Sequence, residues 1–254
     1  MCTTCGDLSH RSLPYSRRSF LSLIGGTGLA LTLPGQALFA AGEPPKPQNV
    51  ISPDKALSRL KKGNARYVSG AMQSHDFAMD RAVLASGQNP FAAILSCSDS
   101  RVSPEYTFDV GRGDVFVVRI AGNFAHLDAL ASLEYAVKFL GSTLIVVLGH
   151  DECGAVSAAI KVQKDGAELP GHLPELVDSI LPAVKTAMRE KGDLLANSIR
   201  ENVARNVRDL RNASPILKRA VEEGKLKVVG GIYKLKNGEV EWLDLDGQGM
   251  KGAL

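Results

Sequence analysis

The stretch LIVVLGHDECG at residues 144–154 decides the fold. It begins with five apolar residues in a row and then passes directly into polar and small residues. An uninterrupted apolar run of this length is typical of a strand buried on both faces, as in a parallel sheet covered by helices. Two similar runs lie upstream, FAAIL at residues 91–95 and VFVV at residues 115–118. We therefore expect interior parallel strands at all three places.

The rest of the chain completes an α/β pattern. Apolar residues at intervals of three and four predict a helix over 129–140, between the second and third strands. Residues 227–233 predict another parallel strand, and 240–245 an edge strand after a turn. Further helices are expected at 53–68 with Ser52 as its cap, at 79–85, 155–163 and 174–189, and at 198–223 with breaks near Asn212 and Pro215. The fold class is thus α/β, with a mainly parallel central sheet of about four strands plus an edge strand, flanked by helices.

Composition excludes several classes of protein. The chain has 254 residues, 44% of them hydrophobic and 22% charged, unlike disordered or polytopic membrane proteins. The formal charge of +3 is small and dispersed, which argues against a nucleic-acid partner. No apolar segment after the N-terminal region is long enough to predict a stable membrane span. A small-molecule substrate is the better expectation.

The N-terminal region has the features of an export signal. Residues 16–21 read SRRSFL, and Arg17 and Arg18 precede an apolar segment, 21–33, that is too short to span a membrane. We interpret residues 1–42 as a twin-arginine signal peptide cleaved after Gly42; a retained N-terminal anchoring helix is the alternative. Residues 43–50 form a proline-rich spacer, and 51–254 a single domain. The expected location is the periplasm or the cell exterior.

The four cysteines are too few for a disulfide scaffold. Removal of residues 1–42 takes away Cys2 and Cys5, together with three arginines and one aspartate, so the formal charge falls from +3 to +1. The C-x-x-C spacing of Cys2 and Cys5 occurs in redox and zinc motifs, but no strand precedes it and no second pair lies nearby. Cys97 and Cys153 remain in the mature chain.

Both remaining cysteines follow expected strands. Cys97 comes after the first strand, and His150 and Cys153 after the third. Ligands bind beyond the carboxyl ends of parallel strands, so these residues are expected to meet there. Two thiolates and an imidazole form a ligand set that selects zinc, with the fourth position left to water or Asp99. The alternatives are a buried structural cysteine, a disulfide between Cys97 and Cys153, and a cysteine nucleophile with His150 as its base.

Asp99 and Arg101 stand next to the first of these cysteines. Side chains two residues apart in a loop can project to the same side and form a charge-assisted hydrogen bond. Arginine would then keep the aspartate ionised and oriented as an acceptor. A plain loop-stabilising ion pair is the alternative.

The ordered set of motifs resembles the β-class carbonic anhydrases over about residues 53–233. The motifs are CSDSRV at 97–102, GDVFVVR at 113–119 with AGN at 121–123, SLEYA at 132–136, GH at 149–150 and CGAV at 153–156. The resemblance implies that Cys97, His150 and Cys153 bind zinc. It also implies that Asp99 and Arg101 form a catalytic dyad, with Asp99 able to take the fourth zinc position in an inactive form. Homodimers, or oligomers built from dimers, with the active site near the subunit interface are implied as well.

Two short segments depart from the pattern of that family. Many members carry a glutamine that can bond bicarbonate where this chain has Val110 and Gly111, and Arg112 in the same loop is unusual. Ile120 stands where an asparagine is frequent after Arg119, which we interpret as a packing variation. The departures concern substrate positioning rather than zinc.

The expected function is zinc-dependent reversible hydration of carbon dioxide to bicarbonate and a proton. His75, His126 and His172 are candidates for proton transfer to buffer, and each is equally open to interpretation as a surface or capping histidine. Two alternative functions are a related zinc hydrolase of carbonyl sulfide or carbon disulfide, and a non-catalytic zinc-binding module.

Overall fold

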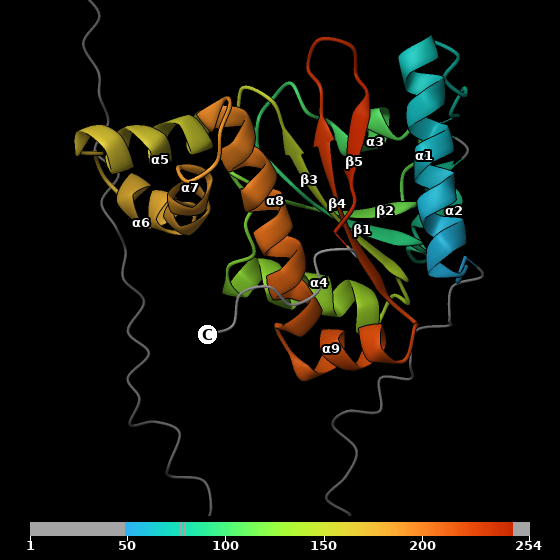
Figure 1. Cartoon of the computed structure of the whole chain (residues 1–254). Helices are drawn as coiled ribbons and strands as arrows, with labels where there is room; N and C mark the ends of the chain where they lie inside the picture. Colours follow the sequence, from blue (N-terminus) through green and yellow to red (C-terminus); the bar gives the residue numbers. More distant parts are fainter. Residues whose placement is uncertain (1–48, 77, 79, 246–254) are drawn as a thin grey trace, which may run out of the picture. The chain divides into compact units, whose positions relative to one another are not determined.

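The sheet has five strands and is parallel except at one edge. The structure is a computed structural model that describes residues 49–76, 78 and 80–245 (Figure 1). The expected signal peptide, and the spacer apart from its last two residues, lie outside the described residues. The strands are β1 (Ala92–Ser96), β2 (Val115–Arg119), β3 (Leu144–His150), β4 (Lys227–Tyr233) and β5 (Val240–Leu243), in the order β2-β1-β3-β4-β5. The first four are mutually parallel where they pair, and β5 runs antiparallel to β4. The expected fold class is confirmed.

Most helices lie where the apolar spacing predicts them. Ser52 caps the first helix by accepting a hydrogen bond from the backbone N–H of Lys55, as expected. The expected helix at 174–189 is divided in two, because Pro182 has no N–H to continue the hydrogen bonding of the preceding turn and instead lies in the first turn of a new helix. The helices are α1 (Pro53–Ser69), α2 (Asp80–Leu84), α3 (Pro104–Thr107), α4 (Leu127–Lys138), α5 (Gly154–Asp165), α6 (Leu173–Asp178), α7 (Leu181–Ala187), α8 (Leu194–Asn212) and α9 (Pro215–Glu222). The short α3 was not expected from the sequence.

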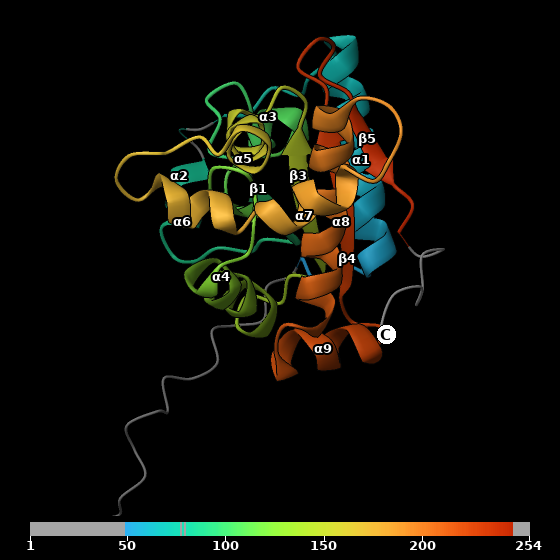
Figure 2. The same ribbon diagram turned by 60° about the vertical axis from the view of Figure 1, so that its left-hand side comes forward.

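Helices cover both faces of the sheet, so the strands carry two apolar faces. Ala93 and Leu95 of β1 belong to a core shared with α4, α5, α7, α8 and α9, whereas Ala92 and Ile94 belong to a core shared with α1. Figures 1 and 2 show α1 on one side of the sheet and α8 on the other. This double coverage explains why the sequence of β1 is an unbroken apolar run.

The position of β2 corrects one expectation. Residues 115–118 were expected in the interior of the sheet, but β2 is its edge strand and its side chains are half-buried or exposed. An apolar run indicates that a strand is covered on both faces and gives no information about its neighbours in the sheet. Among the described residues, β2 pairs with β1 alone.

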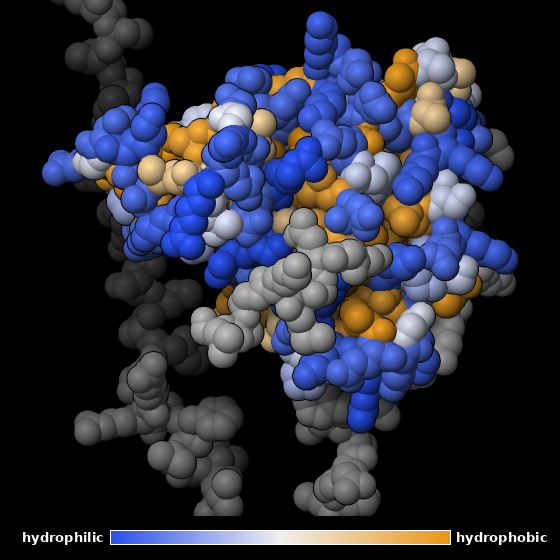
Figure 3. All heavy atoms as spheres, in the orientation of Figure 1, coloured by the Kyte–Doolittle hydropathy of each residue, from blue (hydrophilic) through white to orange (hydrophobic). Residues whose placement is uncertain are grey.

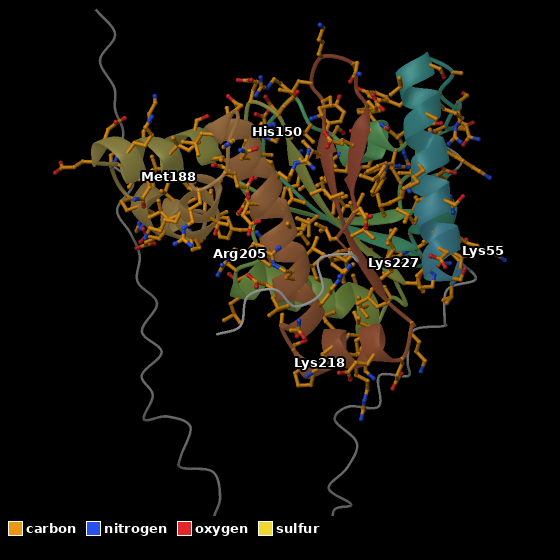
Figure 4. All side chains as sticks on the ribbon, viewed as in Figure 1. Lys55, His150, Met188, Arg205, Lys218 and Lys227 are labelled. Carbon is orange, nitrogen blue, oxygen red and sulfur yellow. The ribbon has the colours of Figure 1, made fainter. Side chains whose placement is uncertain are left out.

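The two ends of the parallel strands differ chemically. His150 is the last residue of β3, at the carboxyl ends of the strands, and Lys227 is the first residue of β4, at their amino ends (Figure 4). Between them the strands contribute mainly apolar side chains.

The face drawn in Figure 3 is largely hydrophilic with small apolar patches. No helix among the described residues has the length and apolar character needed to cross a bilayer.

Candidate active site

Three buried side chains meet at the carboxyl ends of β1 and β3. Cys97 directly follows β1, His150 is the last residue of β3, and Cys153 is the N-cap residue of α5. The two sulfurs and one imidazole nitrogen all lie within 4.8 Å of one another. Their residues are 4%, 0% and 1% exposed, respectively. The expected meeting of these residues is confirmed, and it occurs because β1 and β3 are adjacent parallel strands.

The two thiols are free and electrostatically coupled. They form no disulfide, so the alternative of a Cys97–Cys153 bridge is wrong for this structure. A hydrogen bond from Cys153, together with His150 and the Gly122 N–H, lowers the pKa of Cys97 to about 4 against the opposing effect of burial. The same neighbouring sulfur and burial raise the pKa of Cys153. Two thiolates this close need a cation between them, so the donor set fits zinc.

His150 presents one nitrogen to the sulfurs. Its Nδ1 lies 2.7 Å from the backbone oxygen of Asp151, a contact that requires the proton on Nδ1 and leaves a lone pair on Nε2. Nε2 is buried and has no hydrogen-bond partner of normal geometry among the described residues. The loop that contains Asp151 is itself held to the segment after β4, because Asp151 Oδ1 accepts the Leu235 N–H at 2.8 Å. A fixed tautomer with an inward lone pair is what a metal ligand requires.

Asp99 and Arg101 form a fork-shaped ion pair beside this cluster. The Arg101 Nε lies 2.9 Å from Asp99 Oδ1 and a terminal nitrogen lies 2.8 Å from Oδ2; the Arg101 backbone N–H also donates to Oδ1 at 2.9 Å. These bonds hold the pKa of Asp99 well below its usual range. Its Oδ2 lies 3.8 Å from His150 Nε2. An ionised acceptor is therefore next to the His150 nitrogen that faces the two sulfurs.

Comparison with known proteins agrees with this geometry. The family model described as carbonic anhydrase matches residues 92–240. Carbonic anhydrase 2 of Mycobacterium tuberculosis is 40% identical over 188 residues, which cover 74% of this chain and 91% of the relative. The chain belongs to the β-carbonic anhydrase family.

Solved structures of other β-carbonic anhydrases share the fold. The Coccomyxa β-carbonic anhydrase in complex with acetazolamide is 29% identical with a TM-score of 0.59, over 74% of this chain and 86% of that chain. A tetrameric β-carbonic anhydrase of Sordaria macrospora is 27% identical with the same TM-score of 0.59, over 75% of this chain and 97% of that chain. Like its family, this β-carbonic anhydrase is a zinc enzyme of reversible carbon dioxide hydration.

One further arginine braces the loop that carries the dyad. Arg119, the last residue of β2, donates to the backbone oxygens of Cys97, Asp99 and Val102 at 3.2, 2.7 and 2.9 Å. A single guanidinium thus fixes three carbonyls of one loop. The sequence shows Arg119 only as part of a motif, because nothing in its spacing reveals backbone acceptors in the loop that follows the neighbouring strand β1.

Two residues of the departing loop line a cavity separate from the cluster. Val110 is buried, and with Arg112 it lines a cavity of about 590 Å³. The cavity is further lined by Met72, Gln73, His75, Ser103, Glu105 and Tyr106. None of the three ligand residues borders it. The other departure, Ile120, lies elsewhere: its N–H donates to the backbone oxygen of Ser96 at 3.0 Å, and its side chain packs against the core, as a packing variation would.

The candidate proton-transfer histidines lie apart from the cluster. His126 caps α4, with its Nδ1 accepting the Ala129 N–H at 3.3 Å, as its capping interpretation predicts. His75 Nε2 lies 3.7 Å from Asp109, and His172 is almost fully exposed at the start of α6. No contact of these three histidines with the ligand residues is found among the described residues.

Proposed function

We propose that carbon dioxide is hydrated at the Cys97–His150–Cys153 cluster, with Asp99 and Arg101 as the catalytic dyad. The observation that carries the proposal is the position of Asp99, bound by Arg101 on one side and 3.8 Å from the inward nitrogen of His150 on the other. A loop-stabilising ion pair alone gives no reason for the acid to be placed against the inward nitrogen of His150.

In this proposal each residue of the site has a defined role. Zinc held by these ligands would supply a Lewis acid that lowers the pKa of bound water to about 7. Asp99 accepts a hydrogen bond from the attacking oxygen, which derives from water, and so directs the lone pair of that oxygen toward carbon dioxide. Arg101 keeps Asp99 ionised and fixes its orientation, and it also bonds the backbone oxygen of Glu152 at 3.4 Å, which ties the two loops together. Preorganised acceptors of this kind stabilise the transition state without reorganisation.

The experiment measures zinc content and carbon dioxide hydration on the full chain. We expect Cys153→Ser to lose zinc and hydration activity together, because one thiolate is replaced by a weak ligand. The double variant Cys2→Ser/Cys5→Ser is the matched control and retains both properties. Full zinc content in Cys153→Ser, or no hydration by zinc-loaded wild type, would contradict the assignment. Turnover of carbonyl sulfide much faster than hydration would favour the alternative hydrolase.

We further propose that the enzyme assembles as a homodimer, or as an oligomer built from dimers, through β2 and α4. The strand β2 is a sheet edge with half-exposed apolar side chains, and such edges pair readily with another chain. Rings of Phe116, Tyr135 and Phe139 form a continuous row beside it, with centroid distances of 6.3 and 5.4 Å. The tetrameric relative from Sordaria macrospora supports an oligomer.

Light scattering after size exclusion tests this assembly. Phe139 is 53% exposed, and we expect Phe139→Glu to weaken association at least about tenfold, because it places a charge in an apolar contact. Met188→Glu is the control. Met188 is similarly exposed at 47%, but it is the C-cap residue of α7 and belongs to neither β2 nor α4 (Figure 4). A monomeric wild type, or equal effects of both variants, would contradict the proposed interface.

Export is the last part of the proposal. We propose that residues 1–42 direct the enzyme through the twin-arginine pathway to the periplasm or the cell exterior, on the support of Arg17 and Arg18 before a short apolar segment. A reporter fused to residues 1–42 should be exported, and the Arg17→Lys/Arg18→Lys variant should be retained. Retention of the unaltered fusion in a cell with a working pathway would contradict the proposal.

A further inference from the structure

Two asparagines interrupt the buried side of α8. Asn202 and Asn206 are 1% and 6% exposed and lie on the same side of the helix as Ile199 and Val203. Buried carboxamides are costly unless their hydrogen bonds are satisfied. Their partners therefore show what the two residues do.

These carboxamides form a continuous path of hydrogen bonds to a zinc ligand. Asn206 Nδ2 donates to the backbone oxygen of Asn202 at 2.8 Å, and its Oδ1 accepts the Ala125 N–H at 2.9 Å. Asn202 Nδ2 donates to the backbone oxygen of Gly122 at 2.8 Å. The Gly122 N–H in turn donates to Cys97 Sγ at 3.3 Å. The path joins α8 to the sulfur through a single backbone residue.

The loop that contains Gly122 needs such anchoring. Gly122 has φ +82°, and a Cβ there would lie 2.5 Å from Ile180 Cδ1. The next residue, Asn123, is also in the left-handed region with φ +44°, although it is not glycine. For a residue other than glycine this conformation is strained, so at Asn123 it persists only where the surroundings hold it. Contacts from α8 supply that restraint on one side of the loop.

We propose that Asn202 is a positioning residue for zinc binding, acting through Gly122 on Cys97. By holding the Gly122 carbonyl, it aims the N–H of the same residue at Sγ. An N–H donor on a thiolate disperses its charge and orients its lone pairs, so it adjusts both zinc affinity and the metal–sulfur bond. This inference rests on the proposed function, because it requires Cys97 to be a zinc ligand.

The test replaces Asn202 by leucine, which has nearly the same shape and no donor. Zinc affinity is measured by competition with a chelator, and cobalt substitution reports the thiolate-to-metal charge-transfer band. We expect Asn202→Leu to lower zinc affinity about 10- to 100-fold and to shift the cobalt band. The control is Asn212→Leu, because Asn212 lies at the exposed end of the same helix and its side chain donates to Arg208 O at 3.2 Å, within α8 itself. It should leave both readouts unchanged.

The outcomes separate this inference from the proposed function. Unchanged affinity and an unchanged cobalt band in folded Asn202→Leu would overturn the positioning role. Full zinc affinity in Cys97→Ser would instead show that Cys97 is not a ligand, whatever Asn202 does. If Asn202→Leu does not fold, Asn202→Ala serves as the second variant, because it removes the same donor to the Gly122 carbonyl with a smaller side chain. Lower zinc affinity with a shifted cobalt band in this variant supports the role, and wild-type values of both contradict it.

Discussion

Two aspartate–arginine pairs in this enzyme are chemically alike and differently placed. Asp99 and Arg101 are neighbours in sequence at the open end of β1, and the Asp99 side chain is 17% exposed. Asp109 pairs with Arg66 of α1, far away in sequence, and its side chain is 0% exposed. Asp109 also accepts the Gln73 N–H and lies 3.7 Å from His75 Nε2.

The difference shows how surroundings assign a task to an ion pair. The bonds of Asp109 connect its turn to Arg66 of α1 and to Gln73 in the segment after α1. Its backbone has φ +44°, and these bonds hold that tight turn. Asp99 instead has one side bound by Arg101 and the other next to the ligand cluster. The first arrangement joins separate segments of the fold, and the second supports the proposed role of Asp99 as an acceptor for the reacting groups.

The largest effect is expected from Asp99→Asn. We expect kcat for hydration to fall about 10²- to 10³-fold, the usual cost of removing one preorganised hydrogen-bond partner of the transition state. Zinc content should stay the same, and the free energy of unfolding should change by about 1 kcal/mol or less because the pair is partly exposed. Stopped-flow hydration with metal analysis makes the measurement. Wild-type turnover in this variant would remove Asp99 from the mechanism.

Asp109→Asn is expected to lower stability strongly and to change kcat little, the converse of Asp99→Asn. Loss of the charge leaves Arg66 facing a buried site, which costs on the order of 3 kcal/mol in the free energy of unfolding. Because Asp109 does not border the ligand atoms, kcat of the folded variant should change less than about tenfold. Urea denaturation beside a hydration assay checks both quantities. A catalytic loss as large as that of Asp99→Asn would erase the distinction between the two pairs.

Acid unfolding should depend on Asp109 in a definite direction. Burial acts to raise the pKa of this carboxyl, but Arg66, the Gln73 N–H and His75 outweigh it and hold the pKa below the ordinary 3.8. A lowered carboxyl pKa stabilises the fold above the unfolded value, about 3.9, and the gain is lost as pH falls toward the folded value. Below pH 4, the wild-type free energy of unfolding should therefore fall more steeply than that of Asp109→Asn, by up to about 1.4 kcal/mol per pH unit. Parallel curves would contradict this.

The smallest effect is expected from an exposed pair. Lys227 at the start of β4 contacts Asp54 in the first turn of α1, and the Asp54 side chain is 81% exposed (Figure 4). Asp54→Ala should change the free energy of unfolding by about 1 kcal/mol or less, since solvent screens such pairs. Thermal unfolding at low and high salt is the measurement. A change as large as that of Asp109→Asn would show that exposure does not rank these pairs.

The meeting of the candidate site residues was largely predictable because they cluster in two short loops. Cys97, Asp99 and Arg101 follow one apolar run, and His150 and Cys153 follow another. The positions of β2 and Asn202 were not predictable in this way. The run at 115–118 is as apolar as an interior strand, and only the sheet order places it at an edge. Asn202 is one polar residue on an apolar helix face, and its partner Gly122 lies in a remote loop.

The sequence by itself determined the α/β class, most element positions and the ligand types, because burial period and side-chain chemistry are local properties. Tertiary structure alone decided which loops meet. The parallel pairing of β1 with β3 brings Cys97 to His150 and Cys153, and the packing of α8 brings Asn202 to Gly122. It also decided which aspartate faces the ligands and which is enclosed by its own scaffold. These outcomes depend on strand order and helix packing, which arise from the whole core and are encoded in no single segment.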